Sequence, residues 1–167
     1  MVELRRARIG DVPGIAALVG RFAGRGEILP RTTEEVYQTV REWVVAEQEG
    51  QIVGCGSLVI LWADLAEIRS LVVAPEVQGA GVGRQMVDAL MAQAAELEIP
   101  KVFALTRKTG FFLKMGFHIV PREDLPRKIW KDCVSCIKFI GCDEVAVARN
   151  GLGLWSDRSF PEERFAG

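Results

Sequence analysis

The sequence lacks several features that would point to a particular environment or partner. No apolar run approaches the length of a membrane span, and the first residues, MVELRRARIGD, lack the apolar core of a secretory signal. The formal net charge is −1, so the chain has no overall basic character for binding nucleic acid or a membrane surface. Internal repeats and low-complexity segments are also missing. We therefore expect a cytoplasmic protein with no nucleic-acid or membrane partner.

Residues that bind metal ions are scarce, since the chain has one histidine, His118, and four cysteines, Cys55, Cys133, Cys136 and Cys142. Because no export signal is present, the cysteines are expected to be reduced. Cys133 and Cys136 have the spacing of a zinc half-site, to which Cys142 would add a third ligand. A fourth ligand would have to be Cys55, His118, Asp143 or Glu144. A redox pair is an equal alternative, but we favour reduced cysteines in the wall of a pocket and predict that no metal is required.

The length of 167 residues suits one domain with a substantial core. Apolar runs predict strands at Val2–Ile9, Trp43–Glu47, Gln51–Leu61, Leu65–Val73, Lys101–Leu105, Phe117–Val120 and Glu144–Ala148. Helices are predicted to begin near Asp11, Thr32, Gly83 and Lys108. This order predicts an α+β domain with a mixed sheet over residues 1–148, followed by a C-terminal tail over residues 149–167.

Several helix boundaries carry recognisable signals. Asp11 is predicted to cap the first helix. Thr32 and Glu35 have the pattern of a capping box for the second helix, which we expect to continue through Val40 toward Trp43. The third helix carries a one-sided apolar stripe made of Met86, Val87, Leu90, Met91, Ala94 and Leu97. The glycine at position 116 is suited to end the fourth helix.

The stretch Glu67–Arg84, EIRSLVVAPEVQGAGVGR, contains a buried strand followed by a glycine-rich loop that opens a helix. The loop consists of Gln78, Gly79, Ala80, Gly81, Val82, Gly83 and Arg84. Glycines let a ligand approach backbone N–H groups, and a helix N-terminus attracts anions, so this loop suits a phosphate or pyrophosphate. No lysine follows Gly83 as in a Walker loop, and the glycine spacing is not that of a Rossmann loop. The alternative is a glycine-rich turn without a ligand.

Gln78, Gly81 and Gly83 match the Gln/Arg-x-x-Gly-x-Gly/Ala loop of the GCN5-related N-acetyltransferases, which the chain resembles. The resemblance implies that family's fold, a mixed central sheet flanked by helices. It also implies acetyl-CoA as co-substrate, with its pyrophosphate held by the loop. The backbone N–H groups implied to bond the pantetheine chain and polarise the thioester carbonyl are those of Leu71, Val72 and Val73.

Glu67 is our candidate for the catalytic base. In acetyl transfer the acceptor amine arrives as an ammonium ion, and a carboxylate near the thioester can take its proton directly or through a water molecule. Glu67 lies on the strand that leads to the loop, and the resemblance gives its position this role. The alternative is a solvated charge at a strand edge.

A narrower resemblance rests on three stretches, AEIRSLVV with the loop, KVFALTRKTGFFLKMGF and EDLPRKIWKDC. Together they resemble the stand-alone bacterial N-acetylglutamate synthases over Leu4–Ala148. This implies acetyl transfer from acetyl-CoA to the α-amino group of L-glutamate by direct attack, the first step of arginine biosynthesis. Rival acceptors are glutamine, another small amine or a protein N-terminus. Rivals of other classes are a non-catalytic acetyl-CoA-binding module and a metal or redox protein built on the cysteines.

The acid that protonates the leaving thiolate departs from the common family pattern. Many relatives carry a tyrosine four residues before a Gly-Phe pair, where this chain has Phe112, and the single tyrosine is Tyr37. We assign Phe112 to the coenzyme site and not to proton transfer. The resemblance to the synthases makes Thr106 the candidate acid, with a water molecule as its rival. A thiol has a pKa of about 8.5, so the thiolate can leave with little help.

An acceptor such as glutamate brings two carboxylates, which arginine holds best through paired hydrogen bonds. The candidate substrate-binding residues are Arg21, Arg31, Arg69, Ser70, Lys131 and Lys138. The synthases also use an Arg-Ser pair near the last strand, which Ile140–Cys142 does not preserve.

The tail contains three spaced aromatic residues, Trp155, Phe160 and Phe165. We expect them to pack over the domain or against a second subunit, which is compatible with a homodimer. A loosely ordered chain end is an equal alternative.

Overall fold

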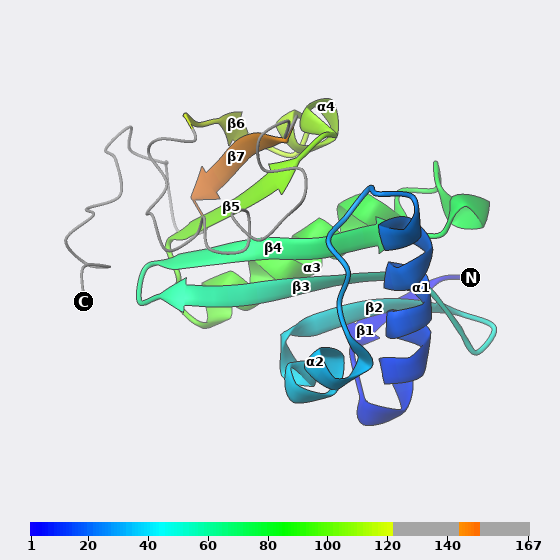
Figure 1. Cartoon of the computed structure of the whole chain (residues 1–167). Coiled ribbons are helices and arrows are strands. Elements are labelled where there is room, and N and C mark those ends of the chain that lie inside the picture. Colours follow the sequence, from blue (N-terminus) through cyan, green and yellow to red (C-terminus); the bar gives the residue numbers. More distant parts are fainter. Residues whose placement is uncertain (122–143, 151–167) are drawn as a thin grey trace.

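The computed structural model describes residues 1–121 and 144–150, which form a seven-stranded sheet in the order β1-β2-β3-β4-β5-β7-β6 (Figure 1). The strands are β1 (Glu3–Arg6), β2 (Trp43–Gln48), β3 (Gln51–Trp62), β4 (Leu65–Val73), β5 (Lys101–Thr106), β6 (His118–Ile119) and β7 (Val145–Asn150). Of the strand pairs in these ranges, β4 and β5 are parallel and the others are antiparallel. The sheet is therefore mixed, as predicted.

Helices cover both faces of the sheet. They are α1 (Val12–Gly24), α2 (Thr33–Gln38), α3 (Val82–Glu96) and α4 (Thr109–Leu113), with 3₁₀ turns η1 (Ile9–Asp11), η2 (Val40–Glu42) and η3 (Pro75–Val77). Figure 1 shows α1 and α2 on one face and α3 on the opposite face. Strand residues alternate accordingly, since Val45 is buried with α1 whereas Val44 and Ala46 are buried with α3.

The apolar stripe of α3 is buried against the sheet, with one exception. Met86, Val87 and Leu90 have no exposed surface. Leu97 was expected to belong to the stripe, but α3 ends at Glu96 and Leu97 is 55% exposed. Ile99, two residues later, turns back into the core instead.

The second helix is shorter than predicted. The capping box is present, because the Thr32 hydroxyl accepts from the Glu35 N–H and the Glu35 carboxylate accepts from the Thr32 N–H. The helix nevertheless ends at Gln38 and does not continue through Val40. Trp43 is the first residue of β2, and its fully buried indole donates to the Thr39 hydroxyl. The spacing of Val36, Val40 and Trp43 is that of a helix, but burial of the Trp43 indole against the sheet favours the strand.

Asp11 precedes α1, but its side chain makes no capping bond there. Both of its carboxylate oxygens instead accept from Arg5 of β1, at 2.7 and 2.9 Å. Arg5 also donates to Glu47 of β2, at 2.6 and 2.9 Å. This ion-pair network is partly buried and joins β1, β2 and η1, so the expected capping role of Asp11 is wrong.

Strand ends differ from the predictions by a few residues. β1 stops at Arg6 because Ile9 already belongs to η1, and β7 continues through Asn150, past the expected domain end at residue 148. The aromatic tail residues Trp155, Phe160 and Phe165 lie outside the described residues. Within the described ranges, no helix is both long enough and apolar enough to cross a membrane.

Candidate active site

The site begins where β4 and β5 separate. In the described chain these parallel strands pair at Leu65–Lys101, Ala66–Val102 and Glu67–Phe103, and their pairing stops there. Figure 1 shows the two strands diverging beyond this point toward their carboxyl ends. The second half of β4 therefore presents one side of its backbone to the space between the strands.

A β-bulge in β4 lies just beyond the point of divergence. Ser57 of β3 is opposite Arg69, and Cys55 is opposite Val72, so two residues of β4 face the single residue Gly56. Ser70 adopts a φ of 54°, which is rare for a residue with a side chain. Bulges of this kind re-aim the backbone and are common beside active sites. The expected substrate contact Ser70 is thus first of all the residue that shapes this strand.

Side chains of β3 stabilise the bulge. The Ser57 hydroxyl donates to the Arg69 carbonyl at 3.1 Å, and the Cys55 thiol lies 3.8 Å from the Ser70 carbonyl oxygen. A Cβ on Gly56 would lie 3.0 Å from Leu71 Cδ1, so a larger residue here would require the Leu71 side chain to shift. Gly54 and Gly56 are two residues apart in β3, and glycines in a strand indicate a bulge or a close neighbour. We did not predict the bulge from these two glycines.

The glycine-rich loop leads directly into α3. Gly79 and Gly81 have φ values of 87° and 83°, which favour glycine, and Gly81 is the residue that precedes the helix. The N–H groups at the start of this 15-residue helix thus lie in a solvent-exposed loop, where an anion can reach them. Val82 buries its side chain in the core and Arg84 is exposed.

Two side chains shape the ends of this loop. The Gln78 amide donates to the Val73 carbonyl at 2.9 Å, which ties the loop to the end of β4. A Cβ on Gly83 would lie 3.3 Å from the Phe111 ring, so the aromatic residue beside the helix start is Phe111. Phe112, which we assigned to the coenzyme site, is 4% exposed and packs edge-on against Phe111 and Phe117. Its place in the core points to a structural role.

Glu67 lies at the last paired position before β4 and β5 diverge. It is 5% exposed, so the alternative of a solvated strand-edge charge is wrong. Its neighbours Ala66 and Ile68 face α3, and Glu67 therefore points to the opposite face. Arg69 Nε donates to Glu67 Oε1 at 2.5 Å, which holds the carboxylate in place.

Thr106 is the last residue of β5 and is 9% exposed. Its hydroxyl oxygen accepts from the Lys108 N–H at 2.8 Å. This bond uses a lone pair of the oxygen and leaves the hydroxyl proton for donation, as a candidate acid requires. Next to it, Arg107 donates to the Gly26 carbonyl at 3.0 Å and links the end of β5 to the loop between α1 and α2. We did not predict this link.

Arg31 and Arg69 lie on the face that carries Glu67. The Arg31 guanidinium lies 5.4 Å above the Trp43 ring, and its Nε is 3.8 Å from the Glu35 carboxylate. Trp43 is opposite Ser57, and Ser57 is opposite Arg69, so these side chains form a row across three strands. Together with Arg31 we call them the Arg31–Arg69 row. Two of the predicted substrate residues therefore come together from a loop and from β4.

The other predicted substrate residues do not join this row. Arg21 is exposed and pairs with Glu76 at 3.2 Å on the molecular surface. Lys131 and Lys138 lie outside the described residues. A residue that we did not predict, Glu42 of η2, is close enough to Arg31 and Arg69 for both to act on its charge. Burial raises the pKa of the Glu42 carboxyl, and the two guanidinium groups oppose that rise.

No cluster of three or more potential metal ligands occurs in residues 1–121 and 144–150. Cys55 is fully buried, and this burial raises the pKa of its thiol, which disfavours the thiolate that a metal would need. Cys133, Cys136 and Cys142 lie outside the described residues. The zinc, redox and reduced-cysteine alternatives for them stay predictions.

The comparison with known families matches residues 20–117 to the acetyltransferase (GNAT) family, a range that contains Glu67, the glycine-rich loop and Thr106. The chain belongs to the GNAT family. An amino-acid acetyltransferase of Mycobacterium tuberculosis is 44% identical over 117 residues, covering 68% of this chain and 67% of that relative. An uncharacterized N-acetyltransferase of Chlorobaculum tepidum is 38% identical over 146 residues, covering 87% of this chain and 94% of the relative.

Solved structures agree with this GNAT assignment. The N-acetylglutamate synthase of Neisseria gonorrhoeae, complexed with coenzyme A and N-acetyl-glutamate, superposes with a TM-score of 0.80 at 31% identity. That match covers 90% of this chain but 35% of the synthase chain. The Rv2747 protein of M. tuberculosis, in complex with CoA and NLQ, gives a TM-score of 0.74 at 32% identity and covers 87% of this chain and 97% of that one. The predicted fold and the expectation of a GNAT enzyme are confirmed.

Proposed function

We propose that this GNAT protein transfers the acetyl group of acetyl-CoA to the α-amino group of an amino acid, with L-glutamate as the acceptor. The observation that carries the proposal is the position of Glu67. It is buried where β4 and β5 diverge, on the strand that continues into the glycine-rich loop, and beside the Arg31–Arg69 row. We therefore take Glu67 as the base for an acceptor bound at this row, with acetyl-CoA bound along β4.

The glycine-rich loop and β4 would bind the coenzyme. The N–H groups that open α3 suit the pyrophosphate, because Gly79 and Gly81 leave the backbone open to it. The pantetheine would extend along the side of β4 that no longer pairs with β5 in the described chain. The N–H groups of Leu71, in the bulge, and of Val72 and Val73, after it, are our candidates for binding the pantetheine and the thioester carbonyl.

The reaction would proceed by direct attack. Glu67 takes a proton from the acceptor ammonium, and the freed amine attacks the thioester carbon to form a C–N bond. The C–S bond then breaks, and the electron pair leaves with the coenzyme as a thiolate. The nitrogen loses its second proton as the neutral amide forms. Thr106 or a water molecule supplies the proton that completes the thiol and regains one from this released proton, so the products are the N-acetylated amino acid and CoA, with the proton on Glu67 passing to solvent.

The acceptor side is suited to a carboxylate. Arg31 is held by stacking on Trp43, and a guanidinium so placed binds a carboxylate with little further loss of freedom. Relatives named amino-acid acetyltransferase, and a synthase solved with N-acetyl-glutamate, support an amino acid as acceptor and glutamate as its first candidate. With glutamate the product would be N-acetyl-L-glutamate, and the reaction would be the first step of arginine biosynthesis.

The test is thiol release from acetyl-CoA by the purified protein against a panel of common amino acids, with buffer alone as blank. We expect release with L-glutamate above the blank, and acetylated product in equal amount by mass spectrometry. CoA binding together with no release for any amino acid would reject the proposed function. Such a result would favour an acetyl-CoA-binding module or a peptide acceptor.

A further inference from the structure

The α1–α2 loop, residues 25–32, begins with a defined turn. Gly26 has a φ of 70°, and its N–H donates to the Ala23 carbonyl at 2.9 Å. The following N–H, that of Glu27, donates to the Phe22 carbonyl at 3.1 Å. A left-handed glycine with these two bonds is a Schellman motif, which ends a helix in a fixed direction. The Gly26 carbonyl therefore leaves α1 with a set orientation.

Arg107 binds that carbonyl from the far end of the sheet. Its Nη2 donates to the Gly26 oxygen at 3.0 Å, although the two residues are 81 positions apart. Arg107 follows Thr106, the last residue of β5, and lies four residues beyond Phe103, the partner of Glu67. The bond therefore joins the first turn of the loop to the carboxyl end of β5, beyond the point where β4 and β5 diverge.

The other end of the loop is anchored on a different strand. The Arg31 guanidinium carbon lies 5.4 Å from the centre of the Trp43 ring in β2, and Thr32 caps α2. In the sheet order β2-β3-β4-β5, a loop held at β2 and at the end of β5 must cross β3 and β4. Figure 1 shows the loop crossing these strands on the side of α1 and α2. Glu67 points to this same side, so the loop crosses the candidate acceptor site.

We propose that Arg107 is a positioning residue that holds the α1–α2 loop across the acceptor site and so fixes Arg31 there. This inference rests on the proposed function. Arg107 acts through the Gly26 carbonyl on the segment that carries Arg31. Without the bond the loop gains conformational freedom, which acceptor binding must then remove.

The experiment measures KM for L-glutamate and kcat by thiol release, and Kd for CoA by calorimetry. In Arg107→Ala, KM should rise about tenfold, the scale of one lost hydrogen bond from a charged donor. The Kd for CoA should stay within about twofold of wild type, because the glycine-rich loop is untouched. Arg107→Lys keeps a charged donor and should bring KM back to within about threefold of wild type.

Arg107 has further interactions, so the bond is also tested from its other partner. Gly26→Ala places a Cβ on a residue with a φ of 70°, which strains the turn and shifts its carbonyl. KM for L-glutamate should rise in this variant as well, again with the Kd for CoA unchanged. A normal KM in Gly26→Ala, together with a raised KM in Arg107→Ala, would contradict the proposal.

Coupling to Arg31 separates positioning from a general structural role. In an Arg31→Ala background, Arg107→Ala should raise KM by less than about twofold, because the group that it positions is gone. A further tenfold rise would show that Arg107 acts independently of Arg31 and would overturn the inference.

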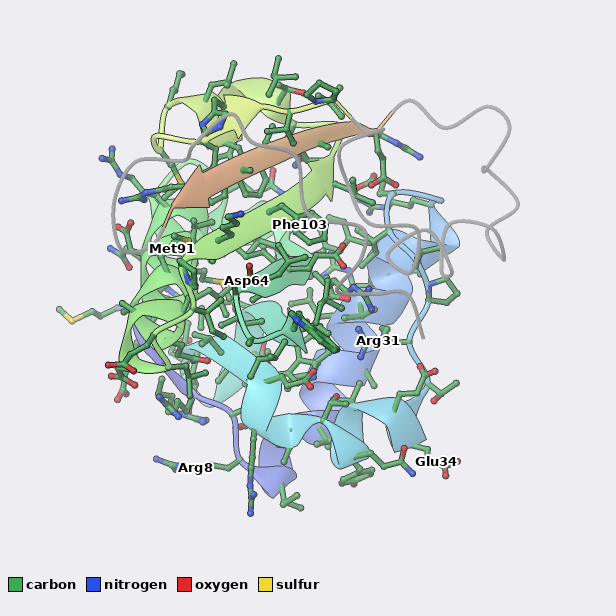
Figure 2. All side chains as sticks on the ribbon, turned by 90° about the vertical axis from the view of Figure 1, so that its left-hand side faces the viewer. Arg8, Arg31, Glu34, Asp64, Met91 and Phe103 are labelled. Atoms are coloured by element: carbon green, nitrogen blue, oxygen red, sulfur yellow. The ribbon has the colours of Figure 1, made fainter. Side chains whose placement is uncertain are left out.

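Amide hydrogen exchange tests the contact without any acceptor. Residues 25–32 should exchange about tenfold faster in Arg107→Ala than in the wild-type protein, while α3 keeps its exchange rates. Arg8→Ala is the matched control, because it removes the same charge from an exposed side chain. Figure 2 shows Arg8 at the outer edge of the molecule and Arg31 nearer its middle. Neither KM nor exchange should change in this control.

Three other outcomes overturn the inference in different ways. Unchanged KM and unchanged exchange in Arg107→Ala reject it and leave the proposed function intact. Faster exchange of residues 25–32 with an unchanged KM confirms the contact but rejects its role in acceptor binding. If the wild-type protein neither binds nor acetylates any amino acid, the proposed function fails and the inference fails with it.

Discussion

The glycine-rich loop and the acceptor row differ in the groups that would bind a ligand. The loop is one contiguous stretch, residues 78–84, in which backbone N–H groups at the start of α3 are the binding elements. The Arg31–Arg69 row, the acceptor row, takes Arg31 from a loop, Trp43 from β2, Ser57 from β3 and Arg69 from β4, with Glu67 beside it on β4. The first site depends on backbone conformation, and the second depends on side-chain charges brought together by the sheet.

This difference implies different responses to mutation. A conformational change in the loop should weaken coenzyme binding whatever the acceptor. A charge change in the row should alter the acceptor or the chemistry and leave coenzyme binding alone. The variants of Glu67, Arg31 and Gly81 test whether the two sites are separable in this way, and two further variants test how charge affects stability.

The largest effect is expected for Glu67→Gln. The amide has nearly the same shape as the carboxylate but cannot take a proton, so kcat should fall by about 10²- to 10⁴-fold. Calorimetry should give a Kd for CoA within about twofold of wild type, because the residue lies outside the loop. A variant with near wild-type turnover would remove Glu67 as the base.

The next largest effect is expected for Arg31→Ala. Loss of a charged hydrogen bond contributes about 1.5–3 kcal/mol, which corresponds to a 10- to 100-fold rise in KM for the acceptor. Arg21→Ala is the matched control, because Arg21 pairs with Glu76 on the surface and should leave KM unchanged. Equal losses in both variants would contradict the placement of the acceptor at the row.

A smaller effect is expected for Gly81→Ala. The φ of 83° is strained for a residue with a Cβ, at a cost of about 1–2 kcal/mol, so the loop should relax and the Kd for CoA should rise about tenfold. Gly20→Ala serves as control, because Gly20 lies inside α1 with open space around its Cβ position. That variant should keep the CoA affinity of wild type. Loss of acceptor selectivity in Gly81→Ala would show that the sites are coupled.

The smallest effect concerns stability and its dependence on pH. Burial raises the folded-state pKa of Glu42, so ionising this group costs stability as the pH rises above its ordinary value of 4.5. Glu42→Gln should therefore be more stable than wild type at pH 7 and lose this advantage below about pH 4.5. Denaturant unfolding at pH 4, 5.5 and 7 measures the difference.

Asp11→Asn should respond with the opposite sign. The hydrogen bonds from Arg5 hold the pKa of Asp11 below its ordinary value of 3.8, so this carboxylate stabilises the fold above that pH and loses its effect as the pH falls through the lowered pKa. The variant should be less stable than wild type at pH 7, and the difference should shrink in acid. Parallel pH dependences for Glu42→Gln and Asp11→Asn would contradict the opposite directions of these two pKa shifts.

The same contrast explains what the sequence could predict. The loop was found because its glycines, its strand and its helix are neighbours in the chain, and local rules act on neighbours. The capping box of Thr32 and Glu35 was found for the same reason. Glu67 could be selected because it lies on the strand next to that loop.

The acceptor row could not be predicted from neighbouring residues in the chain. Its geometry depends on the pairing of β2, β3 and β4, which places Trp43 in line with Ser57 and Arg69. The bulge at Ser70 likewise depends on the register between β3 and β4. Arg21 was chosen because arginine suits a carboxylate, and its surface pair with Glu76 arises only in the folded chain.

The most direct test of the account is CoA binding by the double variant Glu67→Gln/Arg31→Ala. Both changes fall in the acceptor half, so we predict a Kd for CoA within about twofold of wild type by calorimetry, together with no detectable thiol release. A Kd for CoA that rises tenfold or more, in a variant with wild-type thermal stability, would contradict the separation of the coenzyme site from the acceptor row.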